Sequence, residues 1–249
     1  MPGNATTTVG GTNRSVTFDS VAPTLTLAQA AGQSDPTKVP SISFTLSSNE
    51  ALDGSTITAS DFTITNGGTP TITGSGSTWT ITTTATGDGA VTIAPSGTFS
   101  ISDPAGNVRT TAGGTDRSVT YDSTAPTTTI TGGPSGTTTA TTASLTFTAS
   151  ETATFECNLD GAGWTACASP ADYTALADGA HTVQIRATDA AGNVGPVVSR
   201  SWSSDTTAPS VVISSIPAFT NSTSATFTVT IGADAATYSC VLDTKAQPT

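Results

Sequence analysis

The chain reads GGTNRSVTFDSVAPTLTL from Gly10 to Leu27, and nearly the same string, GGTDRSVTYDSTAPTTTI, returns from Gly113 to Ile130. A shorter copy, SRSWSSDTTAPSVVI, runs from Ser199 to Ile213. Strings that recur in the same order indicate repeated structural units placed one after another. Each copy carries an Asp-x-x-Ala-Pro segment, which begins at Asp19, Asp122 or Asp205.

A second motif, Asp-x-Ala-Gly-Asn, stands upstream of the two later copies, at 103–107 and 189–193. The two motifs together divide the chain, and both ends are expected to interrupt a repeat. The predicted segments are the last strand of a preceding repeat (1–18), a first domain (19–121), a second domain (122–204) and the beginning of a third (205–249).

Within each unit, polar and apolar residues alternate, as in Ser41–Leu46, Thr78–Ile81, Ser144–Thr148 and Thr226–Ile231. A period of two indicates strands that bury one face. Gly- and Asp-containing turns separate these runs. About seven short strands per unit are typical of an immunoglobulin-like sandwich. The predicted fold is therefore all-β, with tandem immunoglobulin-like β-sandwich domains arranged end to end.

The acidic composition indicates which classes of binding partner are compatible with the protein surface. Seven basic and eighteen acidic residues give a formal net charge of −11. Such a surface repels nucleic-acid phosphates and anionic lipid, so small cations are the expected counter-ions. The sequence contains no apolar run of membrane-spanning length. We therefore expect no nucleic-acid partner and no membrane insertion in this fragment, and any export signal or anchor would lie outside it.

The cysteines point to an oxidising compartment. Cys157 and Cys167 flank a hairpin with an Asp-Gly turn, and we predict a cross-strand disulfide between them. Such a bond is typical of extracellular proteins. Buried free thiols are the alternative. Cys240 is expected to pair with a cysteine beyond Thr249.

These motifs together resemble bacterial Ig-like repeats of large surface adhesins and other extracellular multidomain proteins. The segment from Phe155 to Asn193 is similar to a cysteine-bearing subtype found in secreted bacterial proteins. The resemblance covers essentially the whole chain and implies a secreted or cell-surface location. Its motifs are specific for the fold but not for one activity, since such domains serve many proteins.

Acidic residues recur where a sandwich would place them at one pole, facing the preceding domain. Several oxygen ligands at a domain junction suit Ca²⁺, which accepts 6–8 of them in a flexible geometry. The predicted ligands are Asp19, Glu50, Asp103 and Asn107 at the first junction, Asp122, Glu151, Asp189 and Asn193 at the second, and Asp205 and Asp234 at the third. An alternative is turn chemistry alone, with Glu151 paired to Arg117 or Arg200.

Residues that could support catalysis lack partners. His181 is the only histidine, and we expect it to be an exposed strand residue. Trp79 and Trp202 are expected in cores, whereas Trp164 is the one candidate for an exposed platform. No phosphate-binding glycine loop, CxxC or HExxH motif is present. We therefore predict that the protein is not an enzyme.

The sequence favours a structural function: an extender or stalk module of a secreted or cell-surface, adhesin-like repeat protein, stiffened by Ca²⁺ at its junctions. Its expected partners are neighbouring Ig-like repeats of the same protein, with a host-surface or matrix ligand bound by other domains. The alternative is a carbohydrate- or protein-binding Ig-like accessory module of a secreted multidomain enzyme. An exposed aromatic cluster on one sheet face would favour that alternative.

Overall fold

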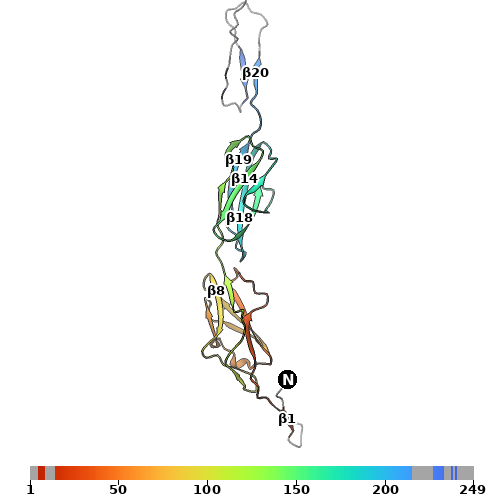
Figure 1. Cartoon of the computed structure of the whole chain (residues 1–249), viewed down its shortest axis with the longest axis vertical. Helices are drawn as coiled ribbons and strands as arrows, with labels where there is room; N and C mark the ends of the chain where they lie inside the picture. The colour runs from red at the N-terminus through yellow and green to blue at the C-terminus, as the bar shows by residue number, and fades with distance from the viewer. Residues whose placement is uncertain (1–4, 9–14, 215–226, 233–236, 238, 240–249) are drawn as a thin grey trace, which may run out of the picture.

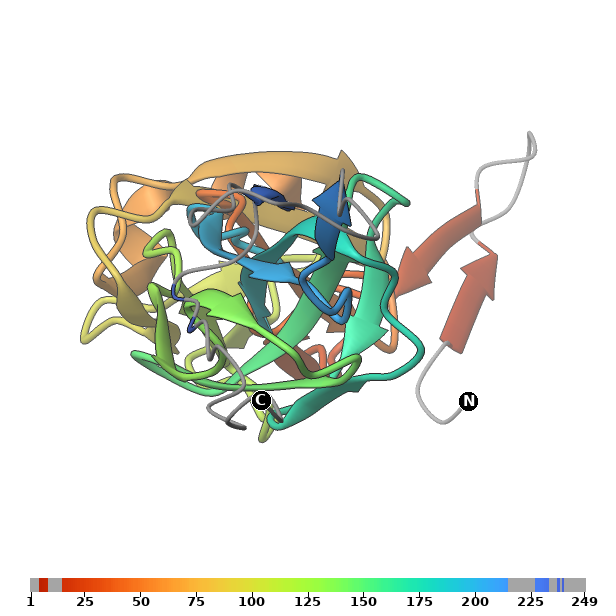
Figure 2. The same cartoon turned by 90° about the horizontal axis from the view of Figure 1, so that it is seen from above.

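In the computed structural model the chain is described over residues 5–8, 15–214, 227–232, 237 and 239. Two β-sandwiches, each with its own hydrophobic core, lie end to end along the longest axis (Figure 1). Viewed along that axis, they overlie each other (Figure 2). The predicted all-β architecture is confirmed, whereas the predicted domain limits stay a prediction.

The first sandwich contains a four-stranded sheet of order β3-β4-β7-β6 and a three-stranded sheet of order β11-β8-β5, both antiparallel. A small hairpin, β9-β10, and two 3₁₀ turns complete it. The elements are β3 (Leu25–Gln29), β4 (Ser41–Ser48), η1 (Gly54–Thr56), η2 (Ala59–Asp61), β5 (Phe62–Thr65), β6 (Thr71–Ser75), β7 (Thr78–Thr84), β8 (Gly89–Pro95), β9 (Ile101–Ser102), β10 (Val108–Arg109) and β11 (Ser118–Tyr121).

The alternation in β4 shows why these residues form a sandwich. Ile42, Phe44 and Leu46 are fully buried, and the residues between them are more exposed. Val91 and Val119 close the core from the opposite sheet, where they are partners across β8 and β11. Each of these strands therefore buries one face, as the two-residue period predicts.

The second sandwich contains a sheet of order β12-β14-β17 and a larger sheet of order β13-β19-β18-β15-β16. Its pairs are antiparallel except β13 with β19, which is parallel. The elements are β12 (Thr128–Gly132), β13 (Gly136–Thr138), β14 (Ala143–Ala149), β15 (Ala153–Leu159), β16 (Thr165–Cys167), β17 (Ala171–Tyr173), β18 (Gly179–Asp189) and β19 (Val198–Ser204).

The predicted disulfide is present. Cys157 in β15 and Cys167 in β16 are bonded, with their Cα atoms 5.8 Å apart. Cys157 is buried in the second core, so the bond fastens the short edge strand β16 to the body of the sheet. Cys240 lies outside the described residues.

The expectation for His181 is wrong: it is buried, not exposed. Both ring nitrogens have hydrogen-bond partners inside the protein, which is how a polar side chain can occupy a core position. Trp202 lies in the second core, as predicted. Trp79 is half-buried against the first core. Trp164 is half-buried, and the Arg186 guanidinium lies 4.3 Å from its ring centroid.

Two further hairpins flank the sandwiches. One pairs β1 (Ala5–Thr8) with β2 (Ser15–Phe18), and the other pairs β20 (Val211–Ser214) with β21 (Thr228–Ile231). In the described part of the chain, no helical segment has the length and apolar character needed to cross a membrane.

Candidate metal centres

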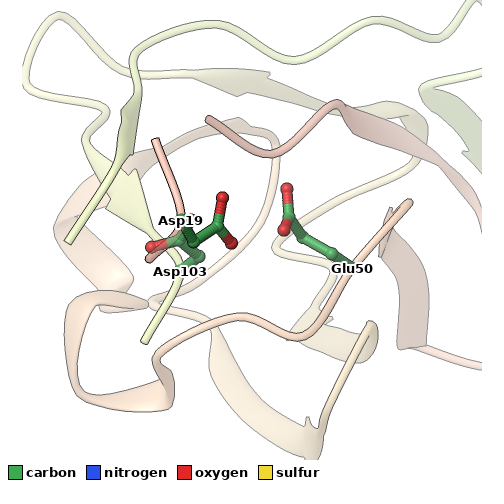
Figure 3. A group of neighbouring side chains, drawn as sticks. All are labelled: Asp19, Glu50 and Asp103. Carbon is green, nitrogen blue, oxygen red and sulfur yellow. The ribbon is translucent and has the colours of Figure 1, made fainter. Parts of the chain in front are cut away.

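Three carboxylates meet at one pole of the first sandwich. Asp19 follows β2, Glu50 follows β4 and Asp103 follows β9, so the fold brings them together from three separate segments (Figure 3). One oxygen from each lies within 4.8 Å of the others. They line a shallow hollow together with Thr17, Ala51, Pro104 and Ala105.

The Asp-x-Ala-Gly-Asn loop fixes Asp103. Its Oδ1 accepts hydrogen bonds from the backbone N–H groups of Ala105 and Asn107, at 2.8 and 2.9 Å. Gly106 supplies the positive φ of 89° that the loop requires. The Asn107 side-chain nitrogen donates to Asp103 Oδ2 and also, at 3.2 Å, to the backbone carbonyl of Asp19. This asparagine therefore fastens the linker to the loop.

Glu50 differs from its two neighbours, because its Oε1 is buried and has no hydrogen-bond partner. Burial, followed by the negative charges of Asp19 and Asp103, raises the pKa of Glu50 above its ordinary value. A buried carboxylate oxygen without a donor, beside two other carboxylates, matches the hard oxygen ligands that Ca²⁺ takes. The residues present thus fit the predicted ion.

The same arrangement recurs at the second sandwich. Asp122 follows β11, Glu151 lies between β14 and β15, and Asp189 ends β18; their oxygens also lie within 4.8 Å of one another. Asn193 repeats the double contact, donating at 2.8 Å to Asp189 Oδ2 and to the Asp122 carbonyl. Glu151 is exposed, unlike Glu50. Desolvation, followed by the charges of Asp122 and other acids, raises the pKa of Glu151.

Turn chemistry accounts for part of this geometry and leaves part unexplained. Burial opposes the ionisation of Asp103, but hydrogen bonds from Asn107 and the loop amides outweigh it and lower its pKa. The same balance lowers the pKa of Asp189. Loop bonds do not explain Glu50, which receives none at Oε1.

The predicted alternative of an ion pair between Glu151 and an arginine is not found. Arg117 donates to the carbonyl of Ala112, and Arg200 donates to the carbonyls of Gly133 and Pro134. Within the described residues, the ion pairs are His181–Asp160 and Arg186–Glu156.

At the third junction, Asp205 accepts a hydrogen bond from the Thr207 backbone N–H, at 3.1 Å. Asp19 and Asp122 make the same turn with Val21 and Thr124. Asp234 lies outside the described residues, so a third cluster stays a prediction.

Two aspartates that hold the linkers were missed in the sequence. Asp88 accepts hydrogen bonds from the Ser123 backbone and hydroxyl, at 2.8 and 2.7 Å, and from the Thr124 hydroxyl. Asp178 accepts from Thr206 and Thr207 in the same way. In the sequence, the Gly-Asp-Gly and Ala-Asp-Gly strings around them indicate only the turns that separate strands. The signal was the recurrence of such a turn before each Asp-Ser/Thr-Thr linker.

The linker between the sandwiches is thus held from both sides. Asp88 of the first sandwich holds Ser123, while Asn193 of the second holds the carbonyl of Asp122. A direct contact crosses the same junction: the Lys38 ammonium donates to the Gly192 carbonyl, at 2.6 Å.

No protein-family model matches the sequence, and no curated protein matches it. Solved structures with some likeness include the fibronectin(III)-like modules of Clostridium thermocellum CbhA, with 17% identity over 72% of this chain and 93% of that chain, at a TM-score of 0.38. A second is the C-terminal 282-residue fragment of intimin in complex with the intimin-binding domain of its translocated receptor, with 12% identity over 78% of this chain and 67% of that one, at 0.31.

A third is the adhesin InvE of Yersinia pseudotuberculosis, with 14% identity over 72% of this chain and 58% of that one, at a TM-score of 0.25. Identities and TM-scores this low have no bearing on function. The assignment of the fold rests on the strand order and the two cores.

Proposed function

We propose that the chain is an extender module of a secreted or cell-surface, adhesin-like protein, and that Ca²⁺ bound at its junctions stiffens it. The observation that carries this proposal is the recurrence of one carboxylate trio at the same pole of both sandwiches. In each trio, one acid comes from the linker and two come from the sandwich that follows. An ion held by all three would therefore join linker and sandwich.

The electrostatics supply the physical reason. Without a cation, the three carboxylates of each trio lie close together and repel one another. Desolvation, followed by this repulsion, raises the pKa of Glu50 and of Glu151. A divalent cation removes this repulsion and adds ligand bonds that the unfolded chain cannot make. The linker would then be restrained by the ion as well as by Asn107 or Asn193.

The disulfide supports the proposed location, because such bonds persist in oxidising, extracellular compartments. The proposed partners are neighbouring repeats of the same protein. A mechanical function is consistent with the end-to-end arrangement of the two sandwiches along the longest axis (Figure 1).

Calorimetry and small-angle scattering of the full chain test the proposal, with EDTA compared with Ca²⁺ and with Mg²⁺ at the same ionic strength. Ca²⁺ at a hundred times its Kd stabilises a binding fold by about 2.7 kcal/mol. A sandwich of this size then melts about 10 °C higher or more. We expect this rise with Ca²⁺, a smaller one with Mg²⁺, and a larger maximum dimension with Ca²⁺. Identical melts and scattering curves in EDTA and Ca²⁺ would exclude calcium stiffening.

A further inference from the structure

A histidine and a tryptophan in the second sandwich occupy the place of two valines in the first. Val91 and Val119 are partners across β8 and β11, whereas His181 and Trp202 are partners across β18 and β19. Both valines are fully buried, and His181 and Trp202 are 7% and 4% exposed. A titratable group thus replaces an apolar one in an otherwise equivalent core position.

The contacts of His181 require a proton on each ring nitrogen. Nδ1 lies 2.7 Å from Asp160 Oδ2, and Nε2 lies 2.8 Å from the carbonyl oxygen of Ala177. Both partners only accept hydrogen bonds. A neutral imidazole has one donor and one acceptor, so one of its nitrogens would face an acceptor without a proton between them. The imidazolium satisfies both contacts.

In the first sandwich, the corresponding two loops are linked by a hydrogen bond that involves no titratable group. Asn66 and Asp160 follow β5 and β15, and both have positive φ, at 57° and 50°. The Asn66 amide donates directly to the carbonyl of Gly87, at 2.7 Å. Gly87 precedes Asp88, just as Ala177 precedes Asp178. Asp160 reaches the equivalent carbonyl only through the ring of His181.

These turns carry the aspartates that hold the linkers: Asp88 binds Ser123, and Asp178 binds Thr206. We propose that protonated His181 links the Asp178 turn to Asp160 through its two ring hydrogen bonds. This link makes the linker after the second sandwich more rigid. Loss of the proton loosens that linker, while the linker held by Asp88 does not respond.

The direction of the response follows from the surroundings of the ring. The hydrogen bond to Asp160, followed by the one to the Ala177 carbonyl, raises the pKa of His181 above 6.5 despite its burial. Asp160 is the charged group in contact with the ring; β19 presents Trp202, and the Asp178 carboxylate is bonded to the linker. Because the pKa of His181 is raised in the folded state, its protonated form stabilises this link fully below pH 6.5. The stabilisation is lost as pH rises through the pKa of the folded state.

The proposal rests on the proposed function in treating the linkers as joints, but His181, Asp160 and Asp178, which make the contacts, are not among the proposed calcium ligands. Its test is therefore done in EDTA, where a failure of calcium binding has no effect on the outcome.

NMR titration of the isotope-labelled full chain from pH 5 to 9 makes the measurement, because His181 is the only histidine. We expect its ring signal to titrate with a midpoint above 6.5 and the Thr206 amide to inflect at the same pH. The Ser123 amide, bonded to Asp88, is the internal control and should not inflect there. A histidine midpoint at or below 6.5, or a Thr206 amide that ignores the titration, would overturn the proposal.

Asp160→Asn provides the matched variant, because it keeps the shape of the site and lets a neutral histidine satisfy both contacts. The asparagine amide donates to Nδ1, and Nε2–H donates to Ala177. The midpoint of His181 should then fall by about one pH unit or more, and the coupled inflection of Thr206 should disappear. An unchanged midpoint would show that Asp160 does not hold the proton.

Discussion

At the scale of single residues, Glu50 and Asp103 belong to one cluster, yet their surroundings shift their pKa values in opposite directions. Asp103 is buried among donors that favour its charged form, whereas Glu50 is desolvated beside two like charges. Of the three carboxylates, Glu50 is thus the one whose negative charge is least stabilised by the surrounding protein. The cation proposed above would supply the partner that its buried oxygen lacks.

Glu50→Gln should therefore change stability with a sign that depends on calcium. The raised pKa means that the contribution of Glu50 to stability is present below pH 4.5 and is lost as pH rises through the folded value. In EDTA at pH 7 the variant should melt a few degrees above the wild type, and the difference should vanish below about pH 4. In Ca²⁺ the order should reverse.

Asp172→Asn is the control for this comparison, because the substitution also removes one negative charge, and Asp172 is exposed on β17. It should leave the melting temperature nearly unchanged in both buffers. A Glu50→Gln variant that is no more stable than the wild type in EDTA at pH 7 would show that the charge of Glu50 does not destabilise the fold.

At the scale of elements, β16 depends on the disulfide. The strand has three residues, and its bond to β15 closes a loop with a sequence separation of 10. Replacing Cys157 and Cys167 together by alanine should lower the free energy of unfolding of the second sandwich by about 2–3 kcal/mol. Urea denaturation measures this loss, and the first sandwich serves as the internal reference. A reductant should reproduce the loss in the wild type and have no effect on the double variant.

The entry of the linker into the second sandwich depends on Gly195. Its backbone N–H donates to the carbonyl of Ala187, and a Cβ at this position would collide with the carbonyl oxygen of Pro126. Gly195→Ala should therefore destabilise the second sandwich by about 1–3 kcal/mol, because backbone atoms must shift. Gly97→Ala, where a Cβ meets nothing within 4 Å, is the control and should be near neutral. Equal thermal unfolding of the two variants would refute the close packing at Pro126.

The same elements show what the sequence could and could not predict. Similar strings in equivalent places identified the acids that meet at the poles of the two sandwiches, because a repeated fold places repeated residues alike. Periodicity identified β4, β7 and β14. The burial of His181 could not be predicted, since its partner Asp160 is 21 residues away and the carbonyl of Ala177 leaves no mark in the sequence. Asp88 was missed because a turn signal gives no information about which distant linker its carboxylate contacts.

At the scale of the whole molecule, the shape depends on the linker between the two sandwiches, which is held by both of them. Asp88→Ala removes the acceptor that fastens Ser123 and Thr124 to the first sandwich. We expect both sandwiches to keep their melting temperatures, because neither core contains Asp88.

The angle between the sandwiches should vary more widely in this variant, so the maximum dimension from small-angle scattering in EDTA should fall. Asp116→Ala, which removes an exposed charge from the same sandwich, should scatter like the wild type. Ca²⁺ should partly restore the dimension, since Asp122, Glu151 and Asp189 remain to hold the other side of the linker. A scattering curve for Asp88→Ala that matches the wild type in EDTA would mean that Asn193 and Lys38 alone fix the joint.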